Sequence, residues 1–174
     1  MRLTPAMQKY VRHWGEMGTR WGMNRSVAQV HALLYLAEAP LNAEEITETL
    51  EIARSNVSNS LKELQAWELI RLTHIPGDRR DHFEAKHDPW DMLMLIVEGR
   101  KRREIDPTVE VLREIAREAE ADGATPEQAR AKIKAMSSFM DQLSGWYAQM
   151  KQIPRPVLLK LMGLGARITK FVSR

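Results

Sequence analysis

The chain of 174 residues contains no cysteine, which excludes disulfides, thiolate chemistry and cysteine-ligated zinc or iron–sulfur sites. It has no apolar run of the roughly 18–20 residues that a membrane-spanning helix needs. The first residues lack the apolar stretch of a secretory signal. Nucleophile elbows, phosphate-binding loops and dinucleotide fingerprints are also missing. We therefore expect a cytoplasmic protein without membrane association, catalytic residues or cofactors, and not an enzyme.

Net positive charge is confined to one end of the chain. The formal net charge is +3, which argues against a uniformly basic nucleic-acid binder. Residues 151–174 carry six Lys and Arg and no acid, so subtracting their +6 from +3 leaves −3 for the rest. Any surface that binds nucleic acid must therefore be a local patch.

Most of the chain shows the periodicity of helices. Residues 5–22 place an apolar stripe on one face, and a later helix over about 54–67 turns Val57, Leu61 and Leu64 inward. Capping-box patterns predict three helix starts, and Asp106-Pro107 predicts an interruption or restart. The stripe comprises Met7, Tyr10, Val11, Trp14, Met17 and Trp21, and the capping pairs are Ser26/Gln29, Asn42/Glu45 and Thr125/Gln128.

The period changes once, where residues 69–75 and 82–86 alternate around the turn-forming Pro76-Gly77-Asp78. This is the only hairpin that the pattern predicts, so the fold class is mainly α with a small β-hairpin. Three short helices followed by a hairpin is the order of a winged helix-turn-helix domain. We divide the chain into an N-terminal helix (1–25), a winged helix-turn-helix DNA-binding domain (26–88) and a C-terminal helical dimerisation region (89–174).

The helix that begins at Arg54 carries the strongest functional signal. Its outward face has short hydrogen-bonding side chains and two cations, and no carboxylate before Glu63. Such a face suits the major groove of DNA, where base edges are read by hydrogen bonds. The preceding helix carries three acids (Glu44, Glu45, Glu48), which we expect to lie away from the duplex. The predicted DNA-binding residues of the helix are Arg54, Ser55, Asn56, Ser58, Asn59 and Lys62.

The tip of the hairpin adds Arg79 and Arg80 as predicted DNA contacts, because arginine fits the negative potential of the minor groove. Asp78 is the predicted support that holds a guanidinium in place. Taken alone, the tip also fits a surface turn whose Asp and Arg side chains pair with each other. The helix and the tip together favour DNA binding.

These residues resemble the MarR-type winged-helix regulators. The stretch from Leu50 to Leu64, followed by Trp67-Glu68-Leu69-Ile70, carries the resemblance, and Asp78 and Arg80 match the Asp-x-Arg wing signature. The stretch Val11–Gly18 resembles the GbsR branch. The resemblance implies a homodimeric bacterial transcription regulator that acts as a repressor or an activator by occupying a DNA operator. It also implies control by a small effector of the choline or betaine type. One departure is Ala53, where relatives often have a hydroxyl residue that caps the helix.

The C-terminal part predicts helix pairing. Seven apolar side chains keep 4-3-4-3 spacing over three heptads, which suits a partner helix in the same chain or in a second copy. The resemblance implies dimerisation through the terminal helices. A last amphipathic helix to about residue 172 fits a buried dimer interface better than an anionic membrane surface. The spaced residues are Ala129, Ile133, Met136, Met140, Leu143, Tyr147 and Met150.

Two further side-chain groups could bind a small ligand or an ion. The aromatic residues Trp14, Trp21 and Tyr35 are candidates for effector binding through cation–π attraction, and core packing is the alternative. The pair His82/His87 with neighbouring aspartates does not have the spacing of metal ligands on a strand, so we expect no metal site.

The sequence therefore predicts a homodimer on a pseudo-palindromic operator, with half-sites about 10 bp apart or a multiple of that, nucleoid-associated when bound. A nonspecific nucleoid-type binder would share the fold and differ only in specificity. A protein-interaction module would show no salt-dependent DNA affinity. A membrane-associated regulator would depend on residues 155–174.

Overall fold

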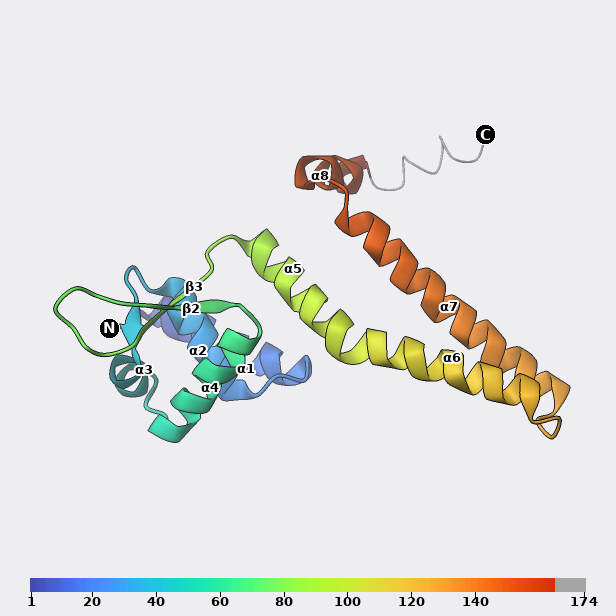
Figure 1. The fold of residues 1–174 in the computed structure, drawn as a ribbon. Coiled ribbons are helices and arrows are strands. Elements are labelled where there is room, and N and C mark those ends of the chain that lie inside the picture. Colours follow the sequence, from blue (N-terminus) through green and yellow to red (C-terminus); the bar gives the residue numbers. More distant parts are fainter. Residues whose placement is uncertain (165–174) are drawn as a thin grey trace. The chain divides into compact units, whose positions relative to one another are not determined.

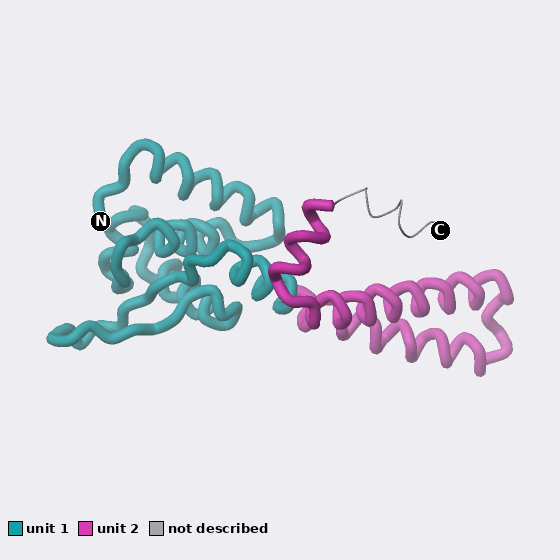
Figure 2. The backbone as a smooth tube through the Cα atoms, turned by 90° about the horizontal axis from the view of Figure 1, so that it is seen from above, with its two compact units in different colours: residues 1–99 teal, residues 100–174 magenta. Residues whose placement is uncertain are grey.

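The computed structural model describes residues 1–164 and divides the chain into two compact units, Met1–Gly99 and Arg100–Arg174 (Figure 2). Both are mainly helical, and the only strands among the described residues form a small sheet in the first unit, which confirms the predicted fold class. The elements that begin in the first unit are α1 (Pro5–Arg20), α2 (Arg25–Leu36), β1 (Leu41–Asn42), α3 (Ala43–Leu50), α4 (Arg54–Ala66), β2 (Ile70–Thr73), β3 (His82–Ala85) and α5 (Pro89–Arg100) (Figure 1).

One hydrophobic core holds the first unit together. Helix α2 contributes Val30, Leu33 and Leu34, all at most 1% exposed. Helix α4 packs against α2 through its predicted inner face, which is buried together with Ile46 of α3. Aliphatic side chains at helical spacing bury one face of each helix and leave the other to solvent. The core therefore fixes α4 with its polar face outward.

Helix α1 packs on α2 through a close backbone approach. The buried residues of α1 are Val11, Gly15 and Gly18. A Cβ atom built on Gly18 would lie 2.4 Å from the Cβ of Ala28. The two glycines of α1 therefore allow a contact that larger residues would prevent. Of the predicted stripe, Trp21 is exposed instead, because it lies just past the last turn of α1.

The sheet has three antiparallel strands in the order β1-β3-β2. The hairpin pairs Ile70 with Ala85 and Thr73 with His82, as the sequence predicted. The third strand was not predicted: Leu41 and Asn42 pair with Phe83 and His82. Two residues are too few to show alternation, so the periodicity of the sequence could not predict β1.

The wing between β2 and β3 turns at Pro76-Gly77. Gly77 has φ +86°, a region that glycine adopts without steric cost, and the Asp78 N–H donates to the Ile75 carbonyl at 3.0 Å. Proline followed by glycine suits this tight turn. The turn brings Asp78 and Arg80 to the start of β3.

The helix caps test three sequence predictions. The capping box of Asn42 and Glu45 at α3 is confirmed. The prediction for Ser26/Gln29 is wrong, because the side chain of Asn24 caps α2 one residue before its start. Helix α4 begins after Ala53 with no side-chain cap, as the departure at that position predicted.

Up to residue 164, the second unit consists of a π-helical turn and three α-helices. They are η1 (Lys101–Ile105), α6 (Asp106–Ala121), α7 (Glu127–Lys151) and α8 (Arg155–Leu164). Proline has no N–H to donate, so Pro107 fits the first turn of α6, and the Asp106 N–H reaches back to the Lys101 carbonyl. The helix thus restarts at the position that the sequence predicted.

Helices α6 and α7 form an antiparallel hairpin (Figures 1 and 2). An ion pair joins Arg113 Nη2 to Asp141 Oδ1 at 2.6 Å. The predicted capping box at Thr125 is wrong, because that hydroxyl donates to Asp122 Oδ2 at 2.6 Å and stays in the loop. Three hydrogen bonds from Ala124 and Thr125 lower the pKa of Asp122, the largest cause being the Thr125 side chain.

Helix α7 has two apolar faces. The predicted residues Ile133, Met140 and Tyr147 are half-buried on the face that carries the buried Ser137. A second row is exposed in this chain, between 40% and 58%, and consists of Met136, Phe139, Leu143 and Trp146. The heptad pattern thus splits between the two faces.

Helix α8 also exposes apolar side chains, among them Val157, Leu159 and Met162. The predicted continuation of this helix to about residue 172 lies outside the described residues. Within residues 1–164, no helix combines the length and the apolar character needed to cross a membrane.

Candidate nucleic-acid interface

The outer face of α4 is polar and open to solvent. The structure leaves all six predicted residues of this helix exposed. Ser60, between them, is buried and donates to the hydroxyl of Ser26 on α2. Exposed donors and acceptors on a helix that is anchored by its buried face are what a groove-reading element requires. The exposed residues are Arg54, Ser55, Asn56, Ser58, Asn59 and Lys62.

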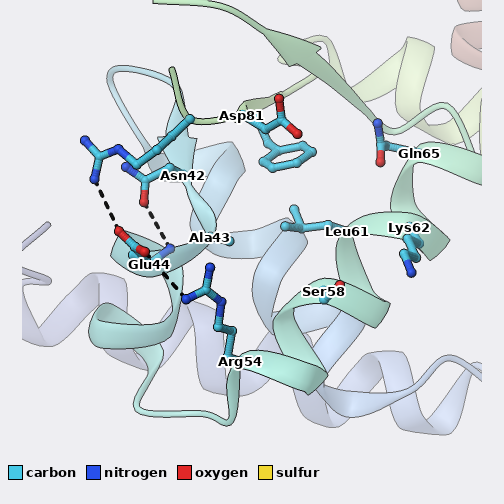
Figure 3. Close-up of a pocket in the computed structure, with 11 residues that line it drawn as sticks. Asn42, Ala43, Glu44, Arg54, Ser58, Leu61, Lys62, Gln65 and Asp81 are labelled. Atoms are coloured by element: carbon cyan, nitrogen blue, oxygen red, sulfur yellow. Dashed lines mark hydrogen bonds and ion pairs between the residues drawn. The ribbon is translucent and has the colours of Figure 1, made fainter. Parts of the chain in front are cut away.

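A groove lies between α4, the start of α3 and the wing (Figure 3). It brings together four of the predicted DNA-binding residues: Arg54, Ser58 and Lys62 from α4, and Arg80 from the wing. The first three recur every four residues along α4, so they share one side of that helix. The sequence did not predict the remaining lining, which includes Gln65, Asp81 and the α3 cap residue Asn42.

The wing arginine is held by its predicted support. Asp78 accepts hydrogen bonds from the Arg80 backbone N–H at 2.9 Å and from its Nε at 3.0 Å. These bonds lower the pKa of Asp78 and raise that of Arg80, with the side-chain hydrogen bond as the largest cause of both shifts. His82, which is buried, contacts both through its ring nitrogens. Arg79 is exposed beside this arrangement.

Glu44 departs from the sequence-based expectation that the acids of α3 lie away from this surface. It lies in the groove, where its two carboxylate oxygens face Arg54 Nη1 at 3.5 Å and Arg80 Nη1 at 3.4 Å. Glu45 instead caps α3, and Glu48 is exposed. The sequence gives no local signal for this bridge, because Arg54 and Arg80 lie 10 and 36 residues away from Glu44 in the chain.

The aromatic effector candidates lie in a row on the first unit. Trp14 contacts Trp21 edge-to-face at 6.2 Å between centroids. Tyr10, which the sequence did not single out as a candidate, stacks on Trp14 at 5.5 Å and on Tyr35 at 6.4 Å. His87 extends the row beyond Tyr35 at 6.4 Å. Tyr10 thus joins two of the predicted residues to the third.

Metal ligands do not gather among residues 1–164: no group of three His, Asp or Glu side chains there could hold an ion. His82 points its Nδ1 at the Arg80 carbonyl oxygen at 2.9 Å. His87 contacts Tyr35. The two histidines therefore have different surroundings.

Comparison with known proteins finds a family model that matches part of the chain. Residues 21–81, which run from the end of α1 into the wing, match the model of the MarR family. No curated protein matches the sequence. A solved structure described as a transcriptional regulator is similar over 83% of this chain and 99% of its own, with 18% identity and a TM-score of 0.56. This likeness establishes the fold.

Other solved structures are less similar. A MepR variant from S. aureus bound to an oligodeoxyribonucleotide has 16% identity over 81% of this chain and 90% of its own, with a TM-score of 0.39. ZitR from Lactococcus lactis in complex with DNA has 22% identity, 70% and 74% coverage, and a TM-score of 0.31. Residues 21–81 are thus similar in sequence to the MarR family, and the solved structure with the TM-score of 0.56 shares the fold of this chain.

Proposed function

We propose that this chain is a sequence-specific DNA-binding transcription regulator of the cytoplasm, nucleoid-associated when bound. The groove carries the proposal, because it gathers cations and hydrogen-bonding groups from α4 and the wing on one exposed surface. In this proposal α4 reads base edges in the major groove and Arg79 and Arg80 contact the adjacent minor groove or backbone. Residues 26–88 act as the DNA-binding domain, and residues 1–25 and 89–174 set the dimer geometry.

The functional molecule in this proposal is a homodimer on a pseudo-palindromic operator, with the chain acting as a repressor or an activator. The exposed apolar row of α7 and the apolar side chains of α8 support it. Large apolar side chains at 3-4 spacing on a solvent face are typical of helices that pair with a second helix. In a homodimer the same row on two copies would bury itself.

Control by a small quaternary amine, as in the GbsR branch, is the finer part of the proposal. The aromatic row of Trp21, Trp14, Tyr10 and Tyr35 supports it, because ring faces attract such cations. The stacked faces of Tyr10 and Trp14 cover each other. The exposed Trp21 therefore offers the accessible indole of this row.

The proposal is tested by fluorescence anisotropy with DNA from upstream of the protein's own gene and with random duplex. Tight, salt-sensitive binding that prefers the upstream DNA is the expected result. Release of that DNA on adding choline or betaine would support the effector. Equal affinity for both duplexes would indicate a nucleoid-type binder, and no binding at low salt would indicate an interaction module.

Asn59→Ala, like Asn56→Ala, is expected to weaken binding to the preferred duplex by about 2 kcal/mol, because a bidentate amide contact to adenine is lost. Binding to random duplex is expected to stay nearly unchanged, since these amides do not pair with phosphates. Anisotropy titrations of both duplexes measure the two changes in binding free energy. An equal loss on both would contradict base reading by this helix.

Trp146→Glu is expected to convert a dimer of two 20.0 kDa chains into monomers at micromolar concentration, because it places a charge in the exposed apolar row. Light scattering after size exclusion measures the mass. Ser138→Glu is the matched control, since it adds the same charge at an exposed polar position of α7. Monomeric wild type, or equal dissociation by both variants, would contradict the proposed interface.

A further inference from the structure

Glu44 links three elements of the DNA-binding surface. It belongs to α3, and its oxygens contact the first residue of α4 and the wing: Oε1 with Arg54 and Oε2 with Arg80. Figure 3 shows its carboxylate in the groove beside Arg54. Its side chain is 49% exposed, and those of Arg54 and Arg80 are 73% and 54% exposed. All three groups are therefore open to a ligand from solvent.

The contacts of Glu44 contribute little to folding. Ion pairs between exposed side chains contribute little to stability, because water screens them. Helix α3 does not need this carboxylate either, since its capping box uses the side chains of Asn42 and Glu45. Glu44 therefore acts mainly on what the groove binds and not on the stability of the fold.

The charges of the groove are closely balanced. Its cations are Arg54, Lys62 and Arg80, and its acids are Glu44 and Asp81. Arg80 already donates to Asp78, so with Glu44 its guanidinium is contacted by two carboxylates. A DNA phosphate that approaches Arg54 or Arg80 must displace Glu44 or lie beside it. Either arrangement costs electrostatic energy that is absent where arginines face solvent alone.

We infer that Glu44 is a specificity-determining positioning residue. It contacts the Nη1 atoms of Arg54 and Arg80, which are donors that a phosphate of any duplex would use, and it keeps both side chains directed into the groove. This lowers affinity for arbitrary DNA more than for a duplex that also offers base contacts to α4. The inference rests on the proposed DNA-binding function.

The test compares Glu44→Gln with Glu48→Gln, which removes the same charge from an exposed position on the same helix. Binding to a random duplex of about 30 bp is measured by anisotropy from about 50 to about 200 mM salt. Glu44→Gln is expected to bind the random duplex about tenfold more tightly at the lower salt concentration. The plot of log K against log salt concentration is expected to be steeper, by the amount that corresponds to about one to two additional phosphate contacts. Glu48→Gln is expected to change affinity by no more than about twofold.

Specificity is measured with a duplex that wild type selects from a random pool. Affinity for this duplex is expected to change less than about threefold in Glu44→Gln, so the ratio of specific to random binding falls. In a chain that carries Arg54→Gln and Arg80→Gln, the effect of Glu44→Gln is expected to shrink to that of Glu48→Gln, because the coupled partners are absent.

The possible outcomes distinguish failure of the role of Glu44 from failure of DNA binding itself. Equal responses to Glu44→Gln and Glu48→Gln, in chains that bind DNA, overturn the role of Glu44 and leave the proposed function standing. If Glu44→Gln has the same effect in the chain that carries Arg54→Gln and Arg80→Gln, the role of Glu44 is likewise overturned and the proposed function still stands. Absence of binding to any duplex by every chain overturns the proposed function and this inference together.

Discussion

Acidification from pH 6.5 to pH 4 is expected to lower the free energy of unfolding by about 3 kcal/mol through His31 alone. This histidine lies in α2 and is 6% exposed. Its Nε2 has no hydrogen-bond partner among the described residues. Burial lowers the pKa of His31 from 6.5 to about 4, because the charged imidazolium would lose its hydration.

The direction of the effect follows from proton binding. Between pH 6.5 and 4 the unfolded chain protonates this side chain while the folded chain keeps it neutral. The unfolded state then binds more protons, so the stability of the folded state is full above pH 6.5 and falls with decreasing pH. About 2 kcal/mol is expected to be lost by pH 5, before most carboxylates protonate.

Urea unfolding followed by circular dichroism at a series of pH values measures this loss. His31→Leu keeps an apolar side chain in the core and cannot titrate, so its curve between pH 6.5 and 5 is expected to be flatter than that of wild type. His74→Gln removes an exposed histidine of the wing segment and should retain the wild-type pH dependence. The expectation fails if His31→Leu loses stability as steeply as wild type over this range.

Much of the fold could be predicted because its main signals are local. Aliphatic spacing identified the inner face of α4, and the cap at Asn42 and the turn at Pro76-Gly77 each depend on a few adjacent residues. The failures involve choices that local pattern cannot make. Asn24 and Ser26 both suit a cap, and the structure uses the first. Strand β1 exists because β3 pairs with it, and the two strands lie too far apart in the chain for a local pattern to show that pairing.

The site was predictable in its residue types and only partly in its arrangement. The outward residues of α4 follow from helical geometry once Val57, Leu61 and Leu64 are placed inside. The contact of Asp78 with Arg80 spans two residues and was accessible for the same reason. The bridge of Glu44 to Arg54 and Arg80 joins side chains of three elements. Its existence depends on how those elements pack, so the sequence pattern favoured the opposite expectation.

The segment Val11–Gly18 both resembles a family branch in sequence and contributes to the packing of the fold. The sequence linked it to a branch of regulators. The structure gives two of its residues a packing role, since Gly15 and Gly18 lie in the contact between α1 and α2. Small residues at such a crossing are required by distance alone. They support the position of α1 and do not by themselves identify an effector.

Gly18→Leu is expected to lower the free energy of unfolding by about 3 kcal/mol, because the new side chain has no room between α1 and α2. A Cβ at residue 18 would already lie 2.4 Å from the Cβ of Ala28, which is 2% exposed. Alanine has no rotamer into which it can move, so the two helices themselves must separate. Urea unfolding at neutral pH measures the change.

A matched pair of smaller variants isolates this clash from the general effect of replacing glycine in a helix. At Gly15 the nearest atom to an added Cβ is Gln29 Cγ at 2.7 Å, and this flexible side chain can turn away. Gly15→Ala is therefore expected to stay within about 0.5 kcal/mol of wild type, since the gain in helix propensity offsets a small rearrangement. Gly18→Ala is expected to be less stable than Gly15→Ala by about 1–2 kcal/mol. Equal stability of the two would show that α1 can move away from α2 freely, and that close packing of these helices does not hold the N-terminal helix in place.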